Sequence, residues 1–187
     1  MDKRLFIGFK ISRKIIDIIN MLRSTLPDGN RYYNWASGNN LHLTLLFLGS
    51  QPENQIENIC NRVEKNISQF NDFHIEISGT GAFSKNQQEQ VLWLGVNEED
   101  SILNRVNYEL KSDLEDLIDT KRVSKFLPHI TIARKKKKYI NNKIDVKSFM
   151  NSVYFPMEFH VKYFTLFQSI PTEKGVRYVK IKNFPLL

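Results

Sequence analysis

Apolar residues recur along this chain in two patterns, one with the spacing of a single helix face and the other as short continuous runs that are typical of buried strands. The helical spacing predicts helices over residues 15–22, 56–67, 103–117 and 144–150. The continuous runs predict strands over residues 5–9, 41–48, 73–82, 90–96, 127–133, 159–168 and 176–181.

The polar stretches between these elements carry turn and helix-start signals. Ser50–Glu53 has the sequence of a capping box with proline in the first turn, which predicts that the second helix begins there. A turn containing Pro171 and Gly175 separates the last two strands. No polar stretch is long enough to separate independent domains, so residues 1–187 are expected to form one domain.

The order of the predicted elements repeats. Each half of the chain reads helix, strand, helix, strand, strand, over roughly residues 12–96 and 99–183. This repeat predicts an α+β fold of two pseudo-symmetric lobes around a central cleft, with antiparallel sheets and helices packed outside. The two halves share no sequence beyond two short motifs.

The motif His-x-Thr-aliphatic occurs as His42–Leu45 and as His129–Ile132, each time inside a predicted strand. The two histidines are 87 positions apart (129 − 42). Side chains at i and i+2 of a strand share a face, so the histidine and threonine of each motif point the same way and the aliphatic residues point into the core. A two-fold relation between the lobes would bring the two polar faces together across the cleft.

The composition limits the partners and the cellular compartment that we expect for this protein. The 187 residues carry a net charge of +7, which favours a polyanionic partner such as nucleic acid. The single cysteine, Cys60, excludes an intramolecular disulfide and a multi-cysteine metal site. The chain has no apolar stretch of signal-peptide or transmembrane length. We therefore expect a cytoplasmic protein with no membrane partner, and nothing in the sequence requires more than a monomer.

Two histidines and two threonines without a neighbouring carboxylate suit metal-free phosphodiester chemistry. Imidazole titrates near neutral pH, so one histidine can act as a base while the other acts as an acid. The hydroxyls of Thr44 and Thr131 can hold phosphate oxygens. Two neutral imidazoles make a poor zinc site, because zinc usually takes three or four protein ligands. We predict His42 and His129 as the catalytic pair, with no cofactor and no metal.

Other side chains leave their roles open. Arg134, five residues after the second histidine, could neutralise charge on a phosphate or contact RNA, or it could merely begin a solvated run of lysines. Trp35, before the first motif, could stack on a base or anchor a loop, and the sequence favours neither. His74, His160 and Cys60 are expected to be structural.

These residues resemble a known family, the 2H phosphoesterases, and within it the LigT-like RNA 2′,3′-cyclic phosphodiesterases, also called 2′-5′ RNA ligases or ThpR. The resemblance extends over essentially the whole chain. Segments similar to the family's opening strand, two signatures, middle strands and C-terminal end are Arg4–Gly8, Trp35, Asn40–Gly49, Gly81–Phe83, Val91–Val96, Pro128–Arg134, Ser169, Gly175, Tyr178 and Pro185–Leu186.

The resemblance implies a bilobal α+β fold and metal-free hydrolysis of an RNA 2′,3′-cyclic phosphate end to a 2′-phosphate. It also implies a weak, reversible 2′-5′ joining activity. By position, His42 and His129 match the catalytic pair, Thr44 and Thr131 the phosphate ligands, and Arg134 a commonly basic site. We assign His42 as the general acid to O3′ and His129 as the general base to water, an order that the near-equivalent motifs do not decide.

Two features depart from the family. Relatives often carry Arg or Lys where this chain has Leu46, which in a regular strand would face the same way as His42, so one RNA contact would be missing. The loop over residues 84–89 lacks the usual Pro-Arg, which affects the rim of the RNA groove. Two alternatives stay open: an enzyme that cleaves 2′-5′ oligonucleotides or small cyclic nucleotides, and an RNA- or nucleotide-binding module without turnover.

Overall fold

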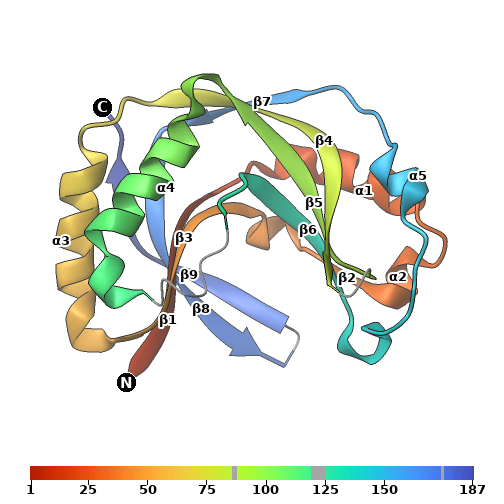
Figure 1. Ribbon diagram of the computed structural model, residues 1–187, viewed down its shortest axis with the longest axis horizontal. Coiled ribbons are helices and arrows are strands. Elements are labelled where there is room, and N and C mark those ends of the chain that lie inside the picture. Colours follow the sequence, from red (N-terminus) through yellow and green to blue (C-terminus); the bar gives the residue numbers. More distant parts are fainter. Residues whose placement is uncertain (86–87, 119–124, 174) are drawn as a thin grey trace.

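The computed structural model of the chain describes residues 1–85, 88–118, 125–173 and 175–187, and its strands form one antiparallel sheet (Figure 1). The sheet order is β7-β4-β5-β6-β3-β1-β8-β9, and β2 pairs with β6 beside this path. The strands are β1 Asp2–Lys10, β2 Tyr33–Trp35, β3 His42–Pro52, β4 Phe73–Lys85, β5 Gln88–Glu98, β6 His129–Lys135, β7 Met157–Val161, β8 Tyr163–Thr172 and β9 Gly175–Pro185. The α-helices are α1 Ile16–Ser24, α2 Gly29–Tyr32, α3 Ile56–Ile67, α4 Ile102–Asp113 and α5 Lys147–Met150.

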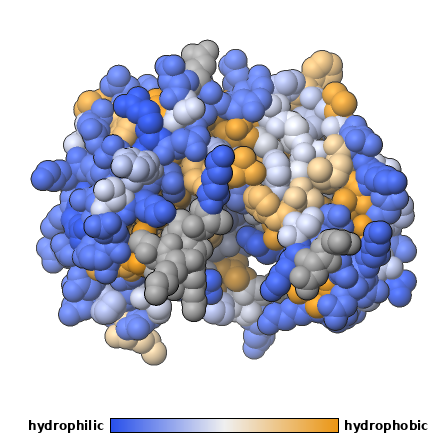
Figure 2. Space-filling view, viewed as in Figure 1, coloured by the Kyte–Doolittle hydropathy of each residue, from blue (hydrophilic) through white to orange (hydrophobic). Residues whose placement is uncertain are grey.

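The helices lie outside the curled sheet in two groups, with α3 and α4 at one end and α1, α2 and α5 at the other (Figure 1). The prediction of an α+β fold with an antiparallel sheet and outer helices is therefore confirmed. Figure 2 shows that the surface on this side is hollowed between the two groups. Within the described residues, no helix is both long and apolar enough to cross a membrane.

The apolar spacing of the sequence becomes a packed face in α3. Its buried residues are Ile59, Cys60, Val63 and Ile67, which lie on one side of the helix, and this helix packs against α4. Burying each large aliphatic side chain stabilises the fold by about 1.5–3 kcal/mol relative to exposure. This packing, rather than intrinsic helix propensity, holds the helix on the sheet.

The two halves of the chain exchange strands in the sheet. The closing strands of the first half, β4 and β5, join the sheet beside β6, the motif strand of the second half. The closing strands of the second half, β8 and β9, join through β1 to β3, the motif strand of the first half. The halves are thus interleaved: β6 pairs directly with a closing strand of the first half, and β3 is connected to the closing strands of the second half through β1.

Both motif strands carry a β-bulge at equivalent positions. The pairing of β3 with β1 skips Leu45, and the pairing of β6 with β5 skips Ile132. These two residues are again 87 positions apart. One extra residue in a strand reverses the faces to which the following side chains point. The two strands accordingly share the same alternation of buried and exposed positions over their first seven residues.

Some predicted boundaries are wrong. The capping box fails because Gln51 still lies in β3, where β1 continues to pair as far as Pro52. The predicted strand over residues 159–168 is two strands in the structure. One of them, β7, pairs with β4 at one edge of the sheet, and the other, β8, pairs with β1 towards the opposite edge. The predicted helix over residues 144–150 is α-helical only over its last four residues.

Replacing Leu43 with alanine tests the contact at the centre of the sheet. Leu43 is fully buried and pairs with Ile130. Leu43→Ala is expected to lower the free energy of unfolding by about 2–5 kcal/mol, because it removes buried methyl groups and leaves a cavity. The control Leu127→Ala, at a leucine that is 47% exposed, should change it by less than about 0.5 kcal/mol. Urea unfolding measures both, and equally small changes would contradict a central role for this contact.

Candidate active site

The two His-x-Thr motifs meet where β3 pairs with β6. The strands pair at Leu43 opposite Ile130, and both of these residues are fully buried. Extending the antiparallel register by one residue in each direction puts each histidine opposite the threonine of the other motif. Because side chains alternate between the faces of a strand, the four polar side chains share the face opposite to the buried pair. All four are partly buried.

Each histidine is oriented by a backbone oxygen two residues before it. The Nδ1 atom of His42 lies 2.6 Å from the oxygen of Asn40, and the Nδ1 atom of His129 lies 2.8 Å from the oxygen of Leu127. A carbonyl oxygen only accepts hydrogen bonds, so each Nδ1 carries a proton and donates it. In the neutral rings, Nε2 is therefore the nitrogen that can accept a proton. The two motifs prepare their histidines in the same tautomer.

Burial lowers the pKa of both imidazoles. Burial is the main reason that the pKa of His42 falls to about 4, and the positive charges of Arg134, His129 and Lys10 lower it further, while the hydrogen bond to Asn40 acts in the opposite direction. Burial also lowers the pKa of His129, again with a smaller contribution from Arg134. Both rings are consequently neutral at pH 7 in the free protein, and an anion bound between them would raise both pKa values.

Aromatic rings pack against His42. The centroid of the Phe6 ring lies 5.1 Å from that of His42, and the Tyr178 ring meets the imidazole edge-on at 4.6 Å. These residues come from β1 and β9, on the same side of the sheet order as β3. Burial by these rings explains why the charged form of His42 is disfavoured.

A second pair of aromatic rings packs against His129. The Phe83 ring lies 4.8 Å from the imidazole, nearly perpendicular to it, and the Trp93 ring lies 6.2 Å away. The Trp93 indole rests on Gly81, where a Cβ atom would come within 2.0 Å of the ring. The glycine therefore leaves the space that lets Trp93 stand beside the histidine. The site thus has an aromatic wall at each histidine.

The bulges decide which residues follow the motifs onto the polar face. The expectation that Leu46 shares the face of His42 is wrong, because the bulge at Leu45 turns Leu46 into the core, where it is 3% exposed. Phe47 is 60% exposed instead, and its ring lies 6.0 Å from Phe6, which itself contacts His42. Sequence reasoning missed Phe47, because the bulge that brings it out has no signature in the sequence.

Arg134 occupies the position in β6 that Phe47 occupies in β3. It is exposed and pairs with Val91, which lies on the same face of β5 as the Trp93 ring beside His129. The charge of Arg134 lowers the pKa of both histidines. Lys10 is a further cation near the site, because it pairs with His42 across β1 and β3. The sequence offered no periodicity that singled out Lys10, since it lies just beyond the predicted first strand. The role of Arg134 as an RNA contact stays a prediction.

Trp35 makes the contacts of a loop anchor. Its Nε1 atom donates a hydrogen bond to the backbone oxygen of Gly29 at 3.4 Å, and the guanidinium of Arg23 lies 5.8 Å from its ring centroid. The residue is partly buried, and it pairs with Ala133 in β6. A role for Trp35 in stacking on a base stays a prediction.

The remaining histidines and the cysteine lie on other elements. His74 and His160 stack across β4 and β7 with 4.2 Å between ring centroids, and His160 Nε2 is 2.9 Å from a carboxylate oxygen of Asp72. Cys60 is buried in α3, where burial raises the pKa of its thiol. Among the described residues, no three His, Cys, Asp or Glu side chains are grouped so as to hold a metal ion.

Comparisons with known proteins identify the family of this chain and agree with its fold. Residues 13–170 match the family model of the 2′-5′ RNA ligase superfamily. An RNA 2′,3′-cyclic phosphodiesterase of Thermotoga maritima is 29% identical over 94% of this chain and 91% of its own length. Another from Archaeoglobus fulgidus is 31% identical over 97% and 99% of the two chains. The crystal structure of E. coli LigT complexed with ATP superposes with a TM-score of 0.72 at 22% identity, covering 100% and 99% of the two chains.

Replacing Arg134 tests its proximity to the histidine pair. Arg134→Gln is expected to raise the pKa of both His42 and His129, because it removes a positive charge that disfavours the imidazolium. NMR titration of the imidazole Cε1–H signals over about pH 3 to 8 follows both groups. Lys137→Gln, at an exposed lysine beyond β6, is the control and should leave both pKa values unchanged. Unchanged pKa values in the Arg134 variant would mean that the guanidinium is too distant to act on a phosphate held by the histidines.

Proposed function

Because this chain belongs to the 2′-5′ RNA ligase superfamily, we propose that it is an RNA 2′,3′-cyclic phosphodiesterase that opens the cyclic phosphate at an RNA 3′ end and leaves a 2′-phosphate. The family match, the two relatives that bear this name and the LigT-like fold support the reaction class. The observation that carries the proposal is the matched pair of histidines, which share one polar face and leave Nε2 as the proton acceptor in each ring.

The proposed reaction needs one proton acceptor and one proton donor on opposite sides of a phosphorus atom. His129 Nε2 takes a proton from water as the water oxygen forms a bond to phosphorus. The bond from phosphorus to O3′ breaks in line, and the protonated Nε2 of His42 gives its proton to O3′. The 2′-phosphate remains on the ribose. His129 has then gained one proton and His42 has lost one, so the pair returns to its starting state by exchanging protons with solvent.

The threonines and Arg134 fit the charge that this reaction handles. The hydroxyls of Thr44 and Thr131 lie on the same polar face as the two histidines, so both can donate to the non-bridging oxygens. The guanidinium of Arg134 can neutralise charge that develops on the phosphate. We propose these three side chains as the phosphate ligands of the site.

The division of roles between the histidines depends on the substrate. In the free protein the pKa of His42 is about 4, so this ring alone does not hold a proton at neutral pH. The negative charge of a bound phosphodiester stabilises the imidazolium and raises that pKa. At neutral pH, His42 therefore carries the proton that it needs as the acid mainly when a phosphate is bound.

Aromatic side chains support a nucleotide as the substrate. Phe47, Phe83 and Tyr178 stand near the histidines, and the first of them is the most exposed of the three. A nucleobase can stack on such a ring with about 1–3 kcal/mol per base. The net charge of +7 supports a polyanionic chain in the same way.

The same site can join RNA ends if a 5′-hydroxyl replaces water. Its oxygen would attack the cyclic phosphate, O3′ would leave, and the product would be a 2′-5′ linkage. An enzyme that acts on 2′-5′ oligonucleotides or small cyclic nucleotides would use the same residues and is separated from the proposal by a panel of substrates. A binding module would hold RNA but form no product.

The function is tested with a short RNA that ends in a 2′,3′-cyclic phosphate, in the presence of EDTA. Turnover is expected in EDTA, since the proposed chemistry uses protein groups alone. The product should carry a 2′-phosphate, because O3′ is the leaving group. His129→Ala and His42→Ala should each lower kcat by at least about 10²-fold to 10⁴-fold, the usual contribution of one acid–base group. A 3′-phosphate product would overturn the assignment of O3′ as leaving group. Wild-type turnover in the His129 variant would remove the acid–base pair altogether.

The pH dependence of kcat/KM follows from the lowered pKa values. This parameter reports the free enzyme, in which the base must be neutral and the acid protonated. Because both histidine pKa values lie below the ordinary 6.5, the bell-shaped profile should have its maximum on the acidic side of pH 6.5. The profile of kcat should lie at higher pH, because bound phosphate raises both pKa values. A flat kcat/KM profile from about pH 5 to 8 would contradict the account.

A further inference from the structure

We propose that a basic and aromatic patch beyond the end of β6 binds the body of the RNA chain whose 3′ end is held at the histidine pair. The patch, which we call the Tyr139 patch, consists of Arg31, Lys136, Lys137, Lys138 and Tyr139. This inference rests on the proposed function, because it takes the histidine pair as the place of the RNA end. It adds a substrate class, namely RNA chains long enough to reach both places.

Tyr139 lies at the centre of the patch among cations. The Lys138 Nζ atom is 4.8 Å from the centroid of its ring, and side-chain hydrogen bonds from Arg31 and Lys138 lower the pKa of its hydroxyl. The ring of Tyr32 meets it edge-on at 5.0 Å, and the guanidinium of Arg31 lies 5.5 Å from the Tyr32 ring. Proteins that bind single-stranded nucleic acids combine aromatic rings with cations in this way.

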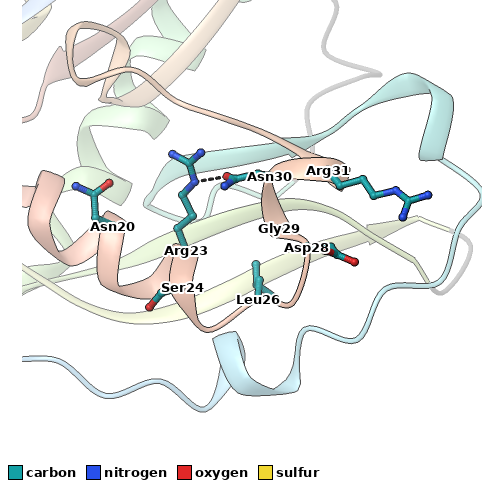
Figure 3. Close-up of a pocket in the computed structure, with 8 residues that line it drawn as sticks. All are labelled: Asn20, Arg23, Ser24, Leu26, Asp28, Gly29, Asn30 and Arg31. Carbon is teal, nitrogen blue, oxygen red and sulfur yellow. Dashed lines mark hydrogen bonds between the residues drawn. The ribbon is translucent and has the colours of Figure 1, made fainter.

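The patch is fixed in place by contacts between α2 and the segment after β6. The backbone N–H of Lys136 donates to the oxygen of Tyr32 at 2.9 Å, and its Nζ atom donates to the oxygen of Asn30 at 2.7 Å. The side chain of Asn30 in turn accepts a hydrogen bond from Arg23, as Figure 3 shows. Arg31 extends from α2 on the side away from Arg23 (Figure 3). A surface held in this way loses little freedom when it binds.

The cations of the patch keep their charge available. In the parts of the chain that the structure describes, none of them forms an ion pair with a carboxylate. Asp28 is the acidic residue whose charge acts on Arg31, and it raises the pKa of that guanidinium only as a minor contribution. Lys137 and Lys138 are exposed. Such cations bind phosphates of a nucleic acid backbone by releasing its counterions.

The position of the patch favours RNA over other polyanions. The strand β6 begins at His129 and leads to Lys136, with exposed Arg134 between them and exposed Asn34 paired beside it. Seven residues at about 3.3 Å each give a span of about 23 Å. Stacked nucleotides at about 3.4 Å each cover this span with roughly seven residues. The cyclic phosphate is at the 3′ end, so the chain that crosses the patch is the 5′ body of the same RNA.

The test compares a short and a long substrate in one variant. The double variant R31Q/K138Q should keep the parent kcat/KM on adenosine 2′,3′-cyclic phosphate, which is too small to reach the patch. On an RNA of about ten nucleotides with a 2′,3′-cyclic phosphate end, kcat/KM should fall by about tenfold. The slope of its logarithm against the logarithm of salt concentration should become shallower by about 1.4, since each phosphate contact to a single strand contributes about 0.7.

Two further variants test whether RNA binding depends on the Tyr139 ring as well as on the cations, and whether the place of the cations on the surface matters. Tyr139→Leu keeps every cation, so it should weaken binding of the long RNA while leaving the salt slope unchanged. K65Q/R105Q removes two exposed cations from α3 and α4, at the other end of the sheet, and should behave like the parent. An equal loss on both substrates in R31Q/K138Q, or no loss on the long RNA, would overturn the inference.

Binding is also measured without turnover, by fluorescence anisotropy of a labelled RNA of about ten nucleotides that ends in a 2′-phosphate. The Kd should rise in R31Q/K138Q and stay unchanged in K65Q/R105Q. If the parent hydrolysed neither substrate, the proposed function would fail, while this measurement would still decide the role of the patch. A parent protein that binds phosphatidylserine vesicles but not this RNA would overturn the inference in favour of a membrane surface.

Discussion

The contact between β3 and β6 is the constraint on which the site depends. Leu43 and Ile130 are buried opposite each other, and the arrangement of the four polar side chains follows from that pairing. Antiparallel register sets each histidine opposite the threonine of the other motif, and strand alternation keeps all four polar side chains on one face. A shift of one residue in either strand would turn the histidine and threonine of that strand into the core. The exchange of closing strands places β5 of the first half beside β6, and it places β8 of the second half beside β1, which pairs with β3.

The pair of bulges allows two nearly equivalent strands to provide different chemistry. Because each bulge reverses the alternation at the same point, the fifth residue after each histidine emerges on the exposed side. In β3 this residue is Phe47, and in β6 it is Arg134. A duplicated scaffold therefore offers an aromatic surface beside one motif and a cation beside the other. The two halves of an approximately symmetric site thus differ in chemistry, which lets the site bind an asymmetric substrate such as an RNA end in one orientation.

Sequence patterns predicted the features of this site that depend on alternation alone. The shared face of histidine and threonine and the equivalence of the motifs follow from period-two spacing, and the α+β class follows from the order of elements. The orientation of Leu46 could not be predicted, since a bulge depends on how the neighbouring strand pairs. The division of residues 159–168 into two strands also depends on partners at distant places in the sheet. Hydrogen bonds from each Nδ1 to a backbone oxygen arise only once the strands are folded.

The most direct test of the two-histidine account uses an RNA cyclic phosphate in which sulfur replaces O3′. A thiolate leaves without a proton, because its conjugate acid is much stronger than that of an alkoxide, with a pKa near 8.5 for a simple thiol. The histidine that protonates O3′ is then dispensable, while the one that activates water is still required. We predict that the sulfur substrate restores most of the rate lost in His42→Ala and little of that lost in His129→Ala. Failure to restore the rate in either variant would contradict the assignment of one histidine as the acid to the leaving group.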